Sequence, residues 1–228
     1  MKNYEYIFWD FDGTLVDTRR GTRESAWYAL EHFNKNIEKN EHLENIFCGP
    51  PLKDSFKKFG LNDDEINEAI KLYRKYQREN TIELSELFNG VKEMLEMLKL
   101  QNKKLIIVTA KVEQTVIKIL EYLEVYEYFD LVVGATEDSS RTKKDEILSY
   151  AISCFKDIDI AKCIMIGDRA SDIKAGINHH MDTIGVSYGM DNRDILQETG
   201  ATYIAENTNK IIEILGSHRK DKDEDFVR

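Results

Sequence analysis

Residues 6–14 of the chain read Tyr-Ile-Phe-Trp-Asp-Phe-Asp-Gly-Thr, an apolar run that ends in two aspartates and a glycine. Successive residues of an extended chain alternate between two faces, so Asp10 and Asp12 can approach one site where this predicted strand ends. Gly13 then allows a sharp turn. An isolated Asp-Gly pair is more often a plain turn, and the interpretation therefore depends on the rest of the chain.

Further apolar runs with strand character follow, and segments with helical periodicity lie between most of them. The runs are residues 105–108, 129–133, 163–166, 183–186 and 202–204. Helical spacing is found in Val91, Leu95 and Leu98, in Val116, Ile119, Leu120 and Leu123, and in Ile147, Leu148, Ala151 and Ile152. This alternation predicts an α/β fold, a parallel sheet with helices on both faces.

Residues 18–84 interrupt the alternation, because they show helical periodicity, as in Ala26, Leu30 and Phe33, and no convincing strand. We expect a core of residues 1–17 and 85–216, with 18–84 as an inserted helical domain. The insert is expected to cover the carboxyl end of the sheet, where open α/β sheets bind ligands. Residues 217–228 are mostly charged and are expected to form a solvated tail.

Three other polar positions lie where predicted strands end or helices begin. Gly167-Asp168 follows the run 163–166, and Asp172 comes one helical turn later. Thr109 closes the run 105–108, and Lys144 opens a predicted helix. Helix capping explains Asp172 equally well on its own, and the neighbouring Lys143 competes with Lys144 for any role in a site.

If Asp10, Asp12 and Asp168 converge, their mutual repulsion requires a bound dication. Oxygen ligands without histidine or thiol favour Mg²⁺, held by the side chains of Asp10 and Asp168 and the main-chain carbonyl of Asp12. Asp10 is then a candidate nucleophile that accepts a phosphoryl group, and Asp12 a candidate general acid and base. Lys144 and Thr109 can offset charge on the phosphoryl oxygens.

These segments together resemble the haloacid dehalogenase superfamily, and within it the capped phosphatases that are similar to phosphoglycolate phosphatase. The matching motifs are Asp10-Phe11-Asp12-Gly13-Thr14, Thr109, Lys144, and Gly167-Asp168 with Asp172. The resemblance implies a Rossmann-like core, a small helical cap after the first motif and obligate Mg²⁺. Because the dehalogenases of the superfamily lack an aspartate two residues after the nucleophile, Asp12 indicates phosphate esters as substrates.

The same resemblance extends to the residues that contact the substrate. It implies that the phosphoryl group is bound by Gly13, Thr14, Thr109, Ala110 and Lys144. Asp172 is expected to lie just outside the metal ligands. The chain departs from the family pattern where Ala110-Lys111 replaces the common Asn-Lys, and where Asp145 replaces the proline after the phosphate-binding lysine.

Substrate choice is expected to lie in the cap. The segment Cys48-Gly49-Pro50-Pro51-Leu52 resembles the cap loop that approaches the active site in this family, but it could equally separate two cap helices. The cap aromatics Trp27, Tyr28 and Phe56 are expected to pack inside the cap rather than to contact substrate.

The composition limits the partners. A net charge of −10 argues against a broad nucleic-acid or anionic-membrane surface, so the expected partner is a small phosphorylated metabolite. The three cysteines suit neither a zinc site nor a disulfide scaffold, and no segment is typical of a signal peptide or a membrane span. We therefore expect a cytoplasmic enzyme, a monomer or a homodimer.

Alternative functions are a sugar-phosphate phosphomutase and a receiver-like module that only accepts phosphate.

Overall fold

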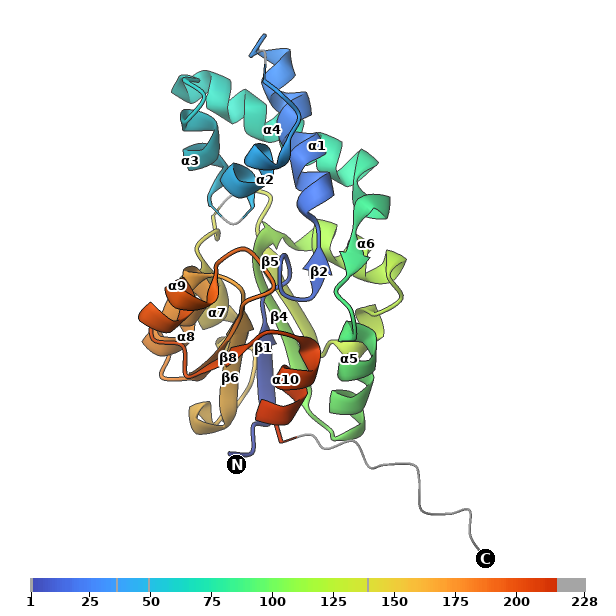
Figure 1. Cartoon of the computed structure of the whole chain (residues 1–228), viewed down its shortest axis with the longest axis vertical. Coiled ribbons are helices and arrows are strands. Elements are labelled where there is room, and N and C mark those ends of the chain that lie inside the picture. The colour runs from blue at the N-terminus through green and yellow to red at the C-terminus, as the bar shows by residue number, and fades with distance from the viewer. Residues whose placement is uncertain (1, 36, 49, 139, 217–228) are drawn as a thin grey trace, which may run out of the picture.

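The computed structural model describes residues 2–35, 37–48, 50–138 and 140–216 (Figure 1). Its main sheet has six parallel strands in the order β5-β4-β1-β6-β7-β8. The strands are β1 (Tyr6–Trp9), β4 (Lys104–Val112), β5 (Leu131–Ala135), β6 (Cys163–Gly167), β7 (Asp182–Val186) and β8 (Tyr203–Ala205). Counted along the chain, this is the Rossmann order 3-2-1-4-5-6, which reverses between β1 and β6.

Different helices cover the two faces of the sheet, because alternate residues of each strand point to opposite sides. Ile7 and Trp9 of β1 belong to a buried cluster with residues of α5, α6 and α10, whereas Phe8 belongs to one with α7 and α8. The prediction of a parallel α/β sheet with helices on both faces is confirmed. The core helices are α5 (Val91–Leu100), α6 (Glu113–Tyr122), α7 (Lys144–Ser153), α8 (Ala170–Asn178), α9 (Arg193–Glu198) and α10 (Thr208–Ile214), with short 3₁₀ turns η2 (Tyr126–Tyr128) and η3 (Ile160–Lys162).

Two strands, β4 and β5, differ from their predicted limits by two residues or more at an end. β4 runs beyond Val108 to Val112, and its register with β5 shifts between these two residues. Such irregularities re-aim side chains, and this one carries Thr109 and Lys111. β5 begins two residues later than expected, because Phe129 still closes the turn η2 through a bond from its amide to the Tyr126 carbonyl.

The residues between β1 and α5 form a separate helical unit above one end of the sheet (Figure 1). It contains α1 (Arg19–His32), α2 (Glu41–Phe47), α3 (Leu52–Lys57), α4 (Asp63–Asn80) and η1 (Ile82–Leu84). Its own buried cluster includes Leu30, Phe47, Phe56 and Tyr73. The inserted all-helical cap is thus present, and residues 18–84 remain our proposed limits for it.

A short antiparallel ribbon joins the cap to the core. It pairs β2 (Val16–Asp17) with β3 (Glu86–Leu87), one strand on each side of the insert. Two-residue strands carry no periodic signal, which explains why the sequence did not predict them. Both connections between cap and core therefore run side by side.

The three cap aromatics pack against other residues of the cap, as expected. Phe56 is fully buried, while Tyr28 stacks on Tyr76 with 4.5 Å between ring centroids and Lys39 lies over the Trp27 ring. The proline segment lies between α2 and α3, with Pro51 as the residue before α3, but Gly49 lies outside the described residues.

The remaining expectations concern the C-terminal tail and membrane-spanning segments. The predicted tail, residues 217–228, also falls outside the described residues. Among the helices of the described ranges, none has the length and apolar character needed to cross a bilayer.

Phe56→Ala should destabilise the cap. The Phe56 ring packs edge-on against Phe47 and Tyr73, with 4.8 Å and 6.3 Å between ring centroids, so its removal leaves a cavity. We expect a loss of about 3–5 kcal/mol in the free energy of unfolding of the unit that contains the cap, measured by urea denaturation. Leu100→Ala is the control, because Leu100 is 84% exposed. Equal effects of the two substitutions would contradict a packed cap core.

Candidate active site

The carboxyl ends of β1 and β6 bring acidic residues together. Trp9 is paired with Ile166 in register, and the Asp10 amide donates to the Ile166 carbonyl at 2.8 Å. Asp10 follows Trp9 directly and Asp168 comes two residues after Ile166, so the two aspartates leave adjacent strands at the same end and become neighbours. Carboxylate oxygens of Asp10, Asp168 and Asp172 lie within 4.8 Å of one another, and all three side chains are buried. This is the place where strand order reverses, at which doubly wound folds bind ligands.

Lys144 supplies a cation to this cluster. It is the first residue of α7, and its Nζ lies 2.6 Å from Asp10 Oδ1 and 2.9 Å from Asp172 Oδ1. The same atom donates to the Val108 carbonyl at 3.0 Å. Lys143 instead points to solvent, with a side chain 78% exposed and an ion pair to Glu146 at 3.5 Å. Of the two competing lysines, Lys144 is the one that lies among the carboxylates.

Burial makes the acidic charges costly. Burial, with the Asp172 carboxylate as the next cause, raises the pKa of Asp10 to about 7. Burial and the neighbouring Asp10 raise the pKa of Asp168 well above its usual range. Burial opposes the charge of Lys144, but Asp10 and Asp172 still raise its pKa above the ordinary value. Three carboxylates and one ammonium group thus leave an excess of negative charge, and this oxygen-rich donor set fits a hard divalent cation.

The first motif folds tightly against Asp168. Thr14 Oγ1 donates to Asp168 Oδ1 at 3.3 Å, and the Met190 amide donates to Asp168 Oδ2 at 2.8 Å. Gly13 has φ of +81°, and a Cβ there would lie 2.1 Å from Asp168 Oδ2. Gly13 is therefore required by both backbone conformation and space. The Thr14 hydroxyl thus contacts Asp168, and its contact with substrate stays a prediction.

Asp12 lies beside the carboxylate cluster rather than inside it. Its side chain, 27% exposed, accepts hydrogen bonds from Thr18 Oγ1 and from Lys111 Nζ, the latter at 2.9 Å. Lys111 reaches it from the irregular end of β4, past buried Thr109 and exposed Ala110. The sequence analysis named Lys111 only because Ala110-Lys111 replaces the common Asn-Lys of the family. Lys111 follows the shift in register between β4 and β5, and no pattern in the sequence predicts such a shift.

Two of the contacts between cap and core away from the ribbon are made by arginines. Arg169, which directly follows Asp168, donates from Nη1 to the Cys48 carbonyl at 2.6 Å. On α4, Arg78 forms a 3.0 Å ion pair with Glu137 of the core. Burial and nearby Asp12 raise the pKa of the Cys48 thiol to about 12, so Cys48 stays protonated and is no nucleophile. The sequence did not predict the contact between Arg169 and the cap.

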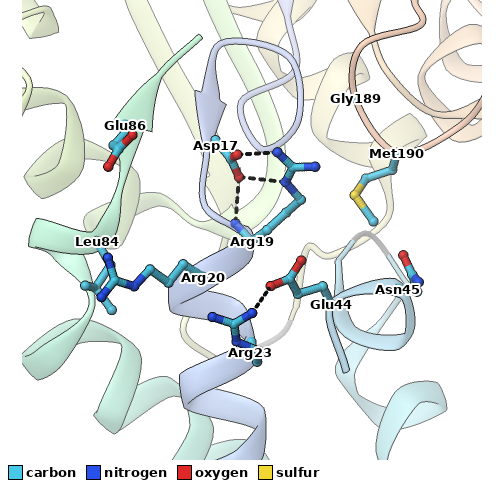
Figure 2. A pocket seen from close by; sticks show the side chains of 10 residues that line it. All are labelled: Asp17, Arg19, Arg20, Arg23, Glu44, Asn45, Leu84, Glu86, Gly189 and Met190. Carbon is cyan, nitrogen blue, oxygen red and sulfur yellow. Dashed lines mark hydrogen bonds and ion pairs between the residues drawn. The ribbon is translucent and has the colours of Figure 1, made fainter. Parts of the chain in front are cut away.

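A cavity of about 460 Å³ lies between cap and core next to this site (Figure 2). Its wall includes Met190, whose amide holds Asp168. Two of its arginines are already paired with carboxylates, Arg19 with Asp17 and Arg23 with Glu44. The residues lining it are Asp17, Arg19, Arg20, Arg23, Glu44, Asn45, Leu84, Glu86, Gly189 and Met190.

Comparison with known proteins agrees with the fold and with the family resemblance. The chain is 28% identical over 214 residues to the tyrosine-protein kinase PtkA of Mycobacterium tuberculosis, covering 93% of this chain and 72% of that protein. It is 32% identical over 216 residues to the pyrophosphatase PpaX of Bacillus velezensis, covering 94% and 98%. A crystal structure from Clostridium acetobutylicum, described as a predicted phosphatase, is 30% identical with a TM-score of 0.88 and covers 95% and 100%. Residues 7–186 match the haloacid dehalogenase-like hydrolases, and the chain belongs to that family.

Proposed function

We propose that this protein is a Mg²⁺-dependent phosphatase that hydrolyses small phosphate monoesters through an aspartyl phosphate on Asp10. The observation that carries the proposal is the buried cluster of Asp10, Asp168 and Asp172 with Lys144 at the strand ends. Such a cluster is costly for stability unless it serves a charged ligand. The hydrolase family and the pyrophosphatase relative support a phosphoryl substrate.

In the first step, an oxygen of Asp10 attacks phosphorus and the bond from phosphorus to the leaving oxygen breaks. Both recorded contacts of the Asp10 carboxylate, with the Phe11 amide at 2.7 Å and Lys144 Nζ at 2.6 Å, use Oδ1. Within the described part of the chain, Oδ2 has no recorded donor, and we assign it as the attacking oxygen. Asp12 gives its proton to the leaving oxygen, so the released product is neutral at that atom.

In the second step, water attacks the phosphorus of the aspartyl phosphate, and Asp12 accepts a proton from the water. The bond from phosphorus to Asp10 breaks, which regenerates the carboxylate and releases inorganic phosphate. Thr18 and Lys111 hold the Asp12 side chain from two sides, which orients it for both proton transfers. Its partial exposure lets water reach it.

The residues that would hold Mg²⁺ are Asp10, Asp168 and the main-chain carbonyl of Asp12. A bound dication would offset the charge of the carboxylates and of the phosphoryl oxygens. Asp172 belongs to the same cluster, but it pairs with Lys144 and so positions that cation. Lys144, Thr109 and the backbone near Gly13 and Ala110 are the proposed phosphoryl contacts.

Other phosphoryl-transfer functions share the first step and differ in the fate of the phosphate. A phosphomutase returns it to a sugar phosphate, a receiver-like module retains it, and a kinase such as the one named for the mycobacterial relative transfers it to a protein. Asp12, as the proposed general base, argues against a receiver-like module that only retains the phosphate, but it would serve a phosphomutase as well as a hydrolase. Stoichiometric release of inorganic phosphate from simple esters distinguishes a hydrolase from all three.

Asp10→Asn should abolish phosphate release. The amide cannot act as the nucleophile, so we expect turnover of p-nitrophenyl phosphate with Mg²⁺ to fall by about 10³-fold or more.

Asp12→Asn should lower the same turnover by about 10²–10⁴-fold, because it removes general acid–base catalysis. Circular dichroism checks that both variants are folded. Substantial turnover by folded Asp10→Asn would refute the nucleophile assignment.

Lys144→Met and Lys143→Met form a matched pair. Lys144 contacts the carboxylates, so its loss should lower turnover by about 10²–10³-fold, whereas loss of exposed Lys143 should leave turnover near that of the wild type. Thermal unfolding of both variants separates loss of fold from loss of function. A larger effect at position 143 would reverse the assignment.

The metal-free protein should lose stability as pH rises from about 4 to about 7. The pKa of Asp10 is raised from its ordinary value to about 7, so the folded state binds more protons than the unfolded chain in this window.

Mg²⁺ should stabilise the ionised cluster, raising the melting temperature at pH 8 by about 5 °C or more and by less at pH 5. Differential scanning fluorimetry with NaCl of equal ionic strength as control measures this. An equal rise at both pH values would argue against metal binding by these carboxylates.

A further inference from the structure

Residues 188–191, which follow β7, pack directly onto Asp168, one of the proposed metal ligands. The Met190 amide donates to Asp168 Oδ2 at 2.8 Å, and the Asp191 amide donates to the Asp168 carbonyl at 3.2 Å. Gly189 lies so close that a Cβ on it would be 2.3 Å from the Asp168 Cβ and 2.4 Å from Oδ2. We call residues 188–191 the clamp segment. It fits against Asp168 because position 189 carries no side chain.

Asp191 also fixes the start of α8, the helix that begins just after Asp168. Arg169, the residue before that helix, has no side-chain acceptor with which to cap it. The Asp191 carboxylate caps it from the clamp segment, since its Oδ2 accepts from the Ala170 amide at 2.8 Å. A carboxylate at this end of a helix also interacts favourably with the helix dipole. Asp191 thus holds both ends of the short link between Asp168 and α8.

Tyr188 fastens the clamp segment to the first motif. Its hydroxyl donates to the Thr14 carbonyl at 2.8 Å, and the Thr14 hydroxyl in turn donates to Asp168 Oδ1 at 3.3 Å. The Tyr188 ring packs against Phe88 with 5.0 Å between centroids, and the Phe88 amide donates to the Leu15 carbonyl at 3.1 Å. Tyr188 therefore fixes Thr14 in the place from which it reaches Asp168.

Both oxygens of the Asp168 carboxylate are thus held by donors, Oδ1 by Thr14 and Oδ2 by Met190. Asp168 is fully buried, so these bonds form away from water, where they are stronger. Donors of this kind favour the ionised carboxylate, and each oxygen keeps lone pairs for a cation. Residues that orient a metal ligand through hydrogen bonds typically change metal affinity by about 10- to 100-fold.

We propose that Tyr188 and Asp191 are positioning residues that hold Asp168 in place for Mg²⁺, and that they affect the reaction through metal affinity rather than through contact with substrate. The inference rests on the proposed function, because Mg²⁺ binding by Asp168 is part of it. Their side chains bond to main-chain atoms of Thr14 and Ala170, so they act on the ligand through the backbone. Without them, Asp168 must be ordered when the metal binds, which lowers the affinity.

Asp191→Ala and Tyr188→Phe test this by calorimetric titration of Mg²⁺ into the substrate-free protein. We expect Asp191→Ala to weaken Mg²⁺ binding by about 10-fold and Tyr188→Phe by about 3-fold or more, because each removes one of the bonds that orient the ligand. Asp191→Asn keeps an oxygen acceptor for the Ala170 amide and should recover most of the affinity. Asp194→Ala and Tyr122→Phe make the same changes at exposed positions and should bind Mg²⁺ as the wild-type protein does.

Kinetics separate positioning from a merely structural role. Both variants should need more Mg²⁺ for half-maximal turnover of p-nitrophenyl phosphate, by the same factors as in calorimetry, while saturating Mg²⁺ restores kcat to within about 2-fold of the wild-type value. Thermal unfolding confirms that each variant is folded at the assay temperature. Unchanged Mg²⁺ affinity in a folded variant would overturn the role of that residue. A loss of kcat that saturating Mg²⁺ does not restore would overturn it as well.

Failure of the proposed function gives a different pattern. If the wild-type protein binds no Mg²⁺, the proposed metal site is wrong and the positioning roles fail with it. If Mg²⁺ binds but Asp10→Asn stays active, only the catalytic proposal is wrong, because the titrations do not depend on turnover. If the wild-type protein and the variants bind Mg²⁺ equally well, only the roles of Tyr188 and Asp191 are wrong.

Discussion

The structure depends on an imbalance of charge in a buried place, because three carboxylates converge on one ammonium group. Asp10, Asp168 and Asp172 repel one another, and Lys144 compensates only part of that repulsion. The rest of the fold must supply the stability that holds them together. The strongly raised pKa values of Asp10 and Asp168 reflect the same cost. Carboxylates that repel one another in this way are well suited to hold a divalent cation beside a phosphoryl group.

The parallel sheet makes this convergence possible. Asp10 and Asp168 leave adjacent strands at the same edge, where the order of the strands reverses. Close approach then requires small residues. A Cβ at Gly167 would lie 2.3 Å from the Asp172 Cβ, so α8 could not begin so close to β6 with a larger side chain there.

The cap and the core contribute different residues to the site. The core holds the groups proposed to bind metal and phosphoryl oxygens, while the cap has a hydrophobic cluster of its own and meets the core at the β2–β3 ribbon, at Cys48 and near Glu137. Asp12 stands at the boundary, held by Thr18 at the start of the cap and Lys111 of the core. The leaving group, which only Asp12 must reach, therefore meets residues of both units, and this is where selectivity can arise.

The sequence by itself determined the sheet, because period-two apolar runs alternating with helical periodicity admit few other folds. It also indicated Asp10, Asp12 and Asp168 as neighbours, because residues that follow parallel strands meet at one edge. Tertiary structure alone decided that Lys144 rather than Lys143 enters the cluster, that the Thr14 hydroxyl serves Asp168, and that Arg169 contacts Cys48 across 121 residues of chain. The reason is physical: local patterns report which face of an element is apolar, whereas the partner of a polar side chain depends on the bulge, the turn and the domain packing that place it.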